Sequence, residues 1–288
     1  MMARHIDRRQ LKAETRELLR SAQVHPKAMA ALYLALLTIL NMADYFSGGI
    51  GASLAGTFVS VLTTLLGGIL SAGFALYCMA IRRGQRAEFL TLFDGFSFVG
   101  KIIGLSIVTT VFTFLWSMLF IIPGIIAAYR YRFAMYNLLE NPDLEILEAL
   151  NMSKQQTFGY KGQLFVLDLS YLGWGLLASL PSIVEGVYLY LQILRDPVLF
   201  MTDPTQLVPL ISSTLLMSLL IWLWSMAVEL LYLPNYQCVE LGYFDIAKET
   251  SGVGMGVQPH QNDGWGGWNG GQDGGWGGQS GPDDLGGY

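Results

Sequence analysis

Charged residues are scarce in this chain, and long stretches contain none. Asp, Glu, Lys and Arg make up 14% of the 288 residues, while hydrophobic residues make up 52%. Soluble domains carry about 25% charged residues, so the composition excludes an ordinary soluble domain. The formal net charge of -5 says little about partners because the charges are unevenly distributed along the chain. We expect membrane lipids as partners, and no nucleic acid.

Cysteine and histidine are also few. The two cysteines, Cys78 and Cys238, form no CxxC pattern and fall near the expected cytoplasmic ends of apolar segments, where thiols stay reduced. The three histidines, His5, His25 and His260, lie outside those segments and far apart in sequence. These features predict two free thiols, and they exclude a Cys/His metal site and a Ser/His/Asp hydrolase.

Nucleotide-binding motifs are missing as well, because no GxxxxGK[ST] phosphate loop occurs. No set of nucleophile, base and metal ligands is visible, so an enzyme acting on membrane lipids is the weakest functional alternative. We expect a protein without enzymatic activity and without a cofactor.

The apolar residues gather into long runs without charge, for example from Tyr45 to Ile81 and from Ile102 to Tyr129. A helix needs about 20 apolar residues to cross a hydrocarbon layer about 30 Å thick. The chain is therefore predicted to be an all-α, polytopic membrane helical bundle with amphipathic interfacial helices. The six predicted spans are 28–46, 54–80, 102–120, 124–139, 163–184 and 207–233.

The basic residues predict how these spans are threaded. Of the 17 Lys and Arg residues, 15 lie in or beside predicted cytoplasmic segments up to Lys161, and Lys248 lies in the predicted cytoplasmic tail, so Arg195 is the one exception. Because cytoplasmic loops are enriched in Lys and Arg, both termini are expected in the cytoplasm. The Gly-rich turn between the first two spans has no basic residue and is expected outside.

The interval 102–139 allows two interpretations. Pro123 and Gly124 form a candidate helix break, which makes 121–123 a tight outer turn between spans three and four. Span four is then short and contains Arg130 and Arg132. The alternative is a single kinked helix, which would leave five spans and an external C-terminus.

Two amphipathic helices are predicted at the membrane surface. Residues 1–27 form a basic N-terminal segment, with Ile6, Leu11 and Leu18 on one side, that either lies against anionic headgroups or is a solvated helix that fixes orientation. A second helix is expected over about 142–157. It would be capped by Asn141, with Pro142 and Asp143 in its first turn.

Glycine marks two further features. Gly100 and Gly104 form a GxxxG pattern that favours close helix packing. Residues 251–288 form a Gly- and Trp-rich tail that is predicted to be disordered, because it cannot bury enough apolar surface to offset its conformational entropy. The tail is either solubilising or engages a protein partner.

A few ionisable residues interrupt the predicted spans and form the candidate site. They are Arg130, Arg132, Asp168 and Glu229, all expected in the cytoplasmic half of the bundle. A lone charge inside a membrane costs several kcal/mol, so these residues are expected to form an ion-pair cluster. The cluster is either a structural clamp or a polar pathway for a proton, an ion or a small solute.

The stretch from Leu119 to Trp174 resembles the central part of the domain-of-unknown-function 975 (DUF975) family of bacterial multi-pass membrane proteins. The residues that carry the resemblance are Ile122, Pro123, Gly124, Tyr129, Tyr131, Tyr136, Asn141, Pro142, Asp143, Ala149, Ser153, Lys154, Gly159, Gly173 and Trp174. The basic opening and the LFDGF sequence at 92–96 are also similar to the family. The resemblance implies a helical membrane protein with no established catalytic residues.

Together these features favour a non-enzymatic membrane scaffold or partner-binding component. The alternative is a transporter or channel-like protein that uses the charged cluster. The sequence leaves the ligand and the oligomeric state open.

Overall fold

The computed structural model describes residues 4–48, 51, 53–195 and 207–255, and every regular element in these ranges is a helix. The predicted all-α class is therefore confirmed. The elements are α1 (Arg8–Arg20), α2 (Pro26–Ser47), α3 (Leu54–Arg82), the 3-10 helix η1 (Phe89–Phe98), α4 (Val99–Leu119), α5 (Ile121–Arg130), α6 (Ala134–Glu140), α7 (Ile146–Gln156), α8 (Lys161–Arg195) and α10 (Leu207–Ser251).

Four helical segments are long and apolar enough to cross a membrane. They are Pro26–Ser47, Leu54–Arg82, Phe89–Leu119 and Lys161–Tyr188. These apolar helices indicate a membrane location, as the composition predicts. The six predicted spans are not all present as separate helices of that kind in the described part of the chain.

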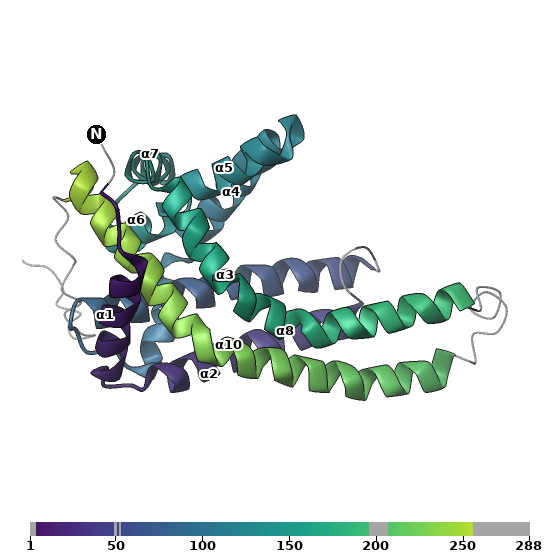
Figure 1. Ribbon diagram of the computed structural model, residues 1–288. Coiled ribbons are helices and arrows are strands. Elements are labelled where there is room, and N and C mark those ends of the chain that lie inside the picture. Colours follow the sequence, from purple (N-terminus) through teal and green to yellow (C-terminus); the bar gives the residue numbers. More distant parts are fainter. Residues whose placement is uncertain (1–3, 49–50, 52, 196–206, 256–288) are drawn as a thin grey trace, which may run out of the picture.

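The long helices project from a compact end of the molecule. Figure 1 shows α2, α3, α8 and α10 extending in the same direction, while the α4–α5 pair diverges from them. The helices α1, α6 and α7 gather around the compact end together with the last part of α10. The largest core cluster lies there and includes the fully buried Tyr77, Phe133, Leu164, Tyr243 and Phe244.

The predicted span 124–139 is wrong, because the structure divides it into α5 and α6 with a turn between them. The helix α4 ends at Leu119, its C-cap residue Phe120 has an extended backbone (φ −162°, ψ 155°), and α5 then packs back against α4. One kinked helix over 102–139 is therefore also wrong. At about 1.5 Å per residue, the 10 residues of α5 cover only about half of the hydrocarbon layer.

The IPG sequence explains this helical hairpin. Pro123 lies in the first turn of α5, where a helix does not need the N–H group that proline lacks. A Cβ atom at Gly124 would overlap the side chain of Ser117 on α4. Glycine therefore allows the two helices to meet, and the chain breaks at Phe120 instead of at Pro123.

Two helices run past the ends that the sequence predicts. The helix α10 continues through Pro234 to Ser251, and α8 continues through Pro181 to Arg195. The predicted stop near Pro234 is therefore wrong. A proline inside a helix removes one hydrogen bond and bends the axis, and Figure 1 shows α10 changing direction along its length. Residues 196–206, in the predicted external connection, lie outside the described residues.

The predicted surface helix starts later than expected. The helix α7 begins at Ile146 instead of Pro142, with Glu145 as its N-cap residue. Asn141 instead accepts a hydrogen bond from the backbone N–H of Asp143 at 3.2 Å, which forms an Asx turn. The Nζ atom of Lys101 on α4 then donates to the carbonyl oxygens of Pro142 and Leu144 and holds this turn.

Glycines allow three further close approaches. A Cβ at Gly73 of α3 would overlap the carbonyl oxygen of Leu92, and one at Gly95 would overlap that of Ile69, so η1 lies backbone to backbone on α3. Leu92 and Gly95 belong to the LFDGF sequence. In the predicted GxxxG pattern only Gly104 meets a neighbour, Ile146 of α7, whereas the space beside Gly100 is open.

Candidate functional site

The charged residues that the sequence singled out surround the turn between α5 and α6. Arg132 lies in this turn, and its guanidinium reaches two other helices. Its Nη1 and Nη2 atoms donate to the two carboxylate oxygens of Asp168 on α8 at 2.6 and 3.0 Å. Its Nε and Nη2 atoms donate to Glu240 on α10 at 2.7 and 3.1 Å. One guanidinium therefore joins three segments of the chain.

Two tyrosines complete the hydrogen bonding of Asp168. The hydroxyl of Tyr129 on α5 donates to one carboxylate oxygen at 2.6 Å, and the hydroxyl of Tyr236 on α10 donates to the other at 2.8 Å. Tyr236 also contacts the Nη2 atom of Arg132. We call these five residues, Arg132, Asp168, Glu240, Tyr129 and Tyr236, the Arg132 cluster. Each oxygen of Asp168 has two donors, which offsets the partial burial of this carboxylate.

The structure brings together only two of the four predicted cluster residues, Arg132 and Asp168. The Arg130 side chain has no ion pair among the described residues, and its backbone carbonyl accepts from Ser153 Oγ at 2.9 Å. Glu229 lies apart on α10 and accepts from Ser225 Oγ at 3.4 Å. The acidic partner that the sequence analysis missed is Glu240.

Glu240 was missed because the predicted helix ended near Pro234. Tyr236 and Glu240 are four residues apart, so in a continuous helix they share one face. That spacing was visible in the sequence and would have identified both residues if α10 had been extended past the proline.

A second set of ion pairs lies at the same end of the molecule. The buried Glu140, at the end of α6, accepts from Arg83, the C-cap residue of α3, and from Lys248 of α10, the latter at 2.6 Å. Arg82 of α3 pairs with Asp245 of α10 at 2.8 Å. The basic residues at the end of α3 therefore bind α6 and α10. From the sequence alone, these residues predict only the side of the membrane.

The helix α7 supports the turn that carries Arg132. Ser153 is fully buried; its hydroxyl accepts from the backbone N–H of Phe133 at 3.1 Å and donates to the carbonyl of Arg130. Gln156 and Asn137 exchange two hydrogen bonds of 2.9 Å each. Lys154, next to Ser153, is exposed. The predicted Ser-Lys pair thus has one residue that positions the turn and one that faces outward.

A family comparison covers this region. The family described as "Protein of unknown function (DUF975)" matches residues 118–197. The predicted resemblance to the DUF975 family is confirmed over these 80 residues. The DUF975 match contains Arg132, Asp168, Tyr129 and Ser153, while Glu240 and Tyr236 lie beyond it. The comparisons with curated proteins and with solved structures found no match.

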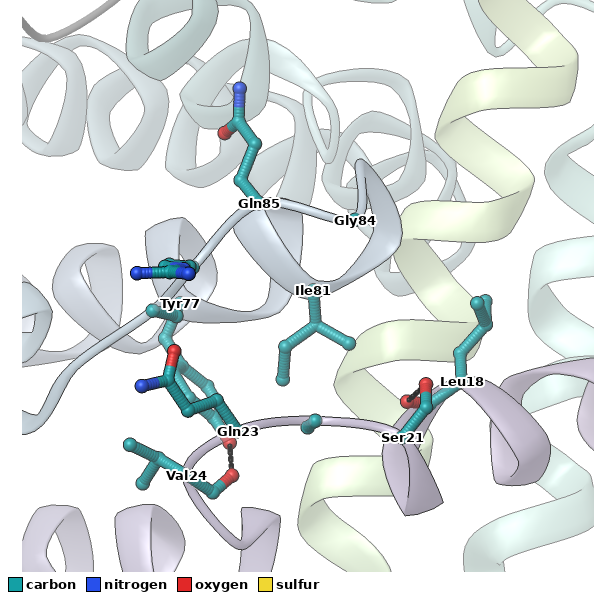
Figure 2. A pocket seen from close by; sticks show the side chains of 11 residues that line it. Leu18, Ser21, Gln23, Val24, Tyr77, Ile81, Gly84 and Gln85 are labelled. Carbon is teal, nitrogen blue, oxygen red and sulfur yellow. Dashed lines mark hydrogen bonds between the residues drawn. The ribbon is translucent and has the colours of Figure 1, made fainter.

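A separate pocket of about 280 Å³ lies under the connection between α1 and α2. Figure 2 shows it between Ser21, Gln23 and Val24 on one side and Gly84 and Gln85 on the other. The hydroxyl of Tyr77 donates to the Val24 carbonyl at 2.8 Å and ties this connection to α3. None of the described residues lining the pocket is a carboxylate or a histidine, so it lacks the usual acid and base groups of a hydrolytic site.

Proposed function

We propose that this DUF975 protein is a non-enzymatic membrane scaffold, with the Arg132 cluster as its rigid joint and the α4–α5 hairpin as a partner-binding surface. The observation that carries the proposal is the exposure of the hairpin end. Met118, Phe120 and Ile121 are 71, 73 and 78% exposed. The hairpin also diverges from the four long helices (Figure 1), which leaves these apolar side chains to lipid or to another protein.

The bonding of the Arg132 cluster supports a clamp over a transport pathway. Arg132 donates to two carboxylates and a tyrosine, and both oxygens of Asp168 are occupied. A moving ion or proton would have to displace these charge-assisted hydrogen bonds, which are among the strongest in proteins. A structural clamp, by contrast, requires these hydrogen bonds to remain formed.

The proposed topology keeps both termini in the cytoplasm. In this proposal the chain crosses the membrane with α2, α3, α8 and the first part of α10. The helix α4 is long enough to cross by itself, but α5 packs back against it and ends at Arg130, so the α4–α5 hairpin is proposed to enter and leave on the cytoplasmic side. Two basic residues at the base of the hairpin, Lys101 and Arg130, support this arrangement. The hairpin replaces predicted spans three and four without changing the side on which the chain emerges.

Photo-crosslinking in native membranes tests the scaffold role. A photoreactive residue at Met118 should form adducts with a discrete protein. The matched control is Leu180 of α8, which is also exposed and apolar at 55%, and it should form lipid adducts. Lipid adducts alone at both positions would contradict a partner-binding hairpin.

The Gly- and Trp-rich tail is a second proposed contact. Residues 256–288 lie outside the described residues, and the proposal rests on their spaced tryptophans, Trp265, Trp268 and Trp276. Deleting 256–288 should remove at least one protein that co-purifies with the full chain. An unchanged set of partners would assign the tail to solubility alone.

A further inference from the structure

A groove of about 420 Å³ lies between α1, the start of α2, α8 and α10. Its lining carries four Lys and Arg side chains, Lys12, Arg16, Arg20 and Lys27, together with His25, whose Nδ1 atom accepts from the backbone N–H of Lys27. None of the described residues that line it is acidic. The N-terminus of α2 also begins here, at Pro26, and adds the partial positive charge of a helix dipole. The groove is therefore strongly electropositive.

Lys12 shows how closely the positive charges are crowded. Its Nζ atom donates to Ser170 Oγ at 2.9 Å and lies 3.9 Å from the centre of the Tyr171 ring. Partial burial, followed by the neighbouring Arg8 and Arg16, lowers the pKa of Lys12. Arg20 has a counter-charge outside the groove, Glu17 at 3.0 Å. An anion in the groove would relieve the remaining repulsion.

The residues that α8 and α10 contribute to the groove are mainly aromatic and apolar. Trp174 of α8 stacks on Tyr232 of α10 with ring centres 6.2 Å apart, and Leu231 is 54% exposed beside them. Tryptophan and tyrosine favour the level of lipid headgroups in membrane proteins. Basic residues from α1 and the start of α2, combined with these rings from α8 and α10, match a molecule with an anionic head and an apolar body.

Asn235 has an unsatisfied hydrogen-bond donor beside the groove. This residue lines the groove, and its Oδ1 atom accepts from the hydroxyl of Tyr171 at 2.6 Å. Its Nδ2 atom is buried and has no hydrogen-bond partner among the described residues. A buried donor without a partner costs about 1–3 kcal/mol, so an acceptor oxygen at this position would stabilise the groove.

We propose that this groove binds the phosphate headgroup of an anionic phospholipid, with Arg16 and Lys27 contacting the phosphate and Trp174 and Tyr232 lying along the apolar part of the lipid. The proposal requires only the membrane location of the protein. It does not depend on the scaffold role, so each can fail without the other.

The test is a lipid titration of the full-length protein in neutral detergent, followed by native mass spectrometry. Phosphatidylglycerol should bind more tightly than phosphatidylcholine. The double variant Arg16→Gln and Lys27→Gln should weaken phosphatidylglycerol binding about tenfold or more, since each basic residue near a membrane surface favours anionic lipid about fivefold. Lys12 is left unchanged because it packs on Tyr171.

The matched control is the double variant Arg4→Gln and Arg9→Gln, which removes the same charge from exposed positions of the same segment that do not line the groove. It should change binding less than about threefold, because exposed charges that do not contact the bound headgroup are screened by solvent and salt. If both double variants lose the same amount of phosphatidylglycerol affinity, and neither changes thermal unfolding without lipid, the loss comes from total charge alone. That result would overturn the proposal. Equal binding of phosphatidylcholine would also overturn it.

Competition with a soluble phosphate compound distinguishes a lipid ligand from a free phosphate ligand. Glycerol 3-phosphate should displace phosphatidylglycerol only at concentrations far above that of the lipid, because it lacks the apolar part that would contact Trp174. Displacement at equal concentration would contradict a lipid ligand and assign the groove to a soluble phosphate compound.

Discussion

The two halves of α10 differ in a way that reverses the usual relation between polarity and burial. Before Pro234 the helix carries exposed apolar side chains, such as Leu220 and Leu223 at 52 and 49%. After Pro234 it carries Glu240, Asp245 and Lys248, yet Val239, Leu241 and Phe244 are at most 1% exposed. The half with more charge is therefore the half inside the protein core.

The contrast between the two halves of α10 follows if one half is surrounded by lipid and the other by water. In lipid, an exposed leucine costs nothing, because the hydrocarbon is as apolar as the side chain and no hydrophobic force drives helices together. In water, the same leucine is buried, and the charges that accompany it require partners. The Arg132 cluster and the pairs of Glu140 supply those partners. One end of the molecule folds as a water-soluble protein does, and the other is adapted to lipid.

Breaking the Arg132 cluster should have the largest effect. Arg132→Met leaves Asp168 and Glu240 without their cation, at side-chain exposures of 30 and 7%, which we expect to destabilise the protein by about 3–5 kcal/mol. Thermal or denaturant unfolding in detergent measures it. Arg130→Met should have little effect, since that side chain has no ion pair among the described residues. Similar losses in both variants would mean that the cluster is not a clamp.

Truncating a leucine in the buried half of α10 should rank next. Leu241 is 1% exposed, so Leu241→Ala should cost about 2–5 kcal/mol in the free energy of unfolding. The same unfolding assay applies. A cost below about 1 kcal/mol would show that this half is not packed as a protein core.

The close approach of η1 to α3 gives a smaller expected loss. In Gly73→Ala the new Cβ meets the backbone of Leu92, and the resulting shift should cost about 1–3 kcal/mol. Gly67→Ala in the same helix is the control, because its Cβ would make an ordinary contact of 3.6 Å with Leu37. If both variants unfold at the same temperature, η1 does not lie on α3 through these glycines.

The smallest effect is expected in the lipid-facing half. Leu220→Ala removes the same atoms as Leu241→Ala from an exposed site and should change stability by less than about 0.5 kcal/mol. A loss comparable to that of Leu241→Ala would place Leu220 in a protein interface and would remove the contrast between the two halves of α10.

The sequence predicted the parts of the fold that depend on apolar length. The first two spans, 28–46 and 54–80, match α2 and α3 to within two residues at each end. Arg132 and Asp168 could be paired in advance, because charges inside apolar stretches require partners. The errors occur where tertiary contacts override local signals. Pro234 bends α10 without ending it, since the helix beyond is held by the core and by Glu240. The short helix α5 is held by Ser117 and Gly124 packing, which no periodicity indicates.

Cysteine labelling at position 120 tests the proposed arrangement most directly. The variant Phe120→Cys places a thiol at the end of the α4–α5 hairpin, where the side chain is 73% exposed; the parent protein controls for the buried Cys78 and Cys238. If the hairpin enters and leaves on the cytoplasmic side, a membrane-impermeant maleimide should not label it in intact cells or in inside-out vesicles. After detergent solubilisation the maleimide should label the thiol at position 120. Labelling from outside intact cells would show that α4 crosses the membrane and would contradict a re-entrant hairpin.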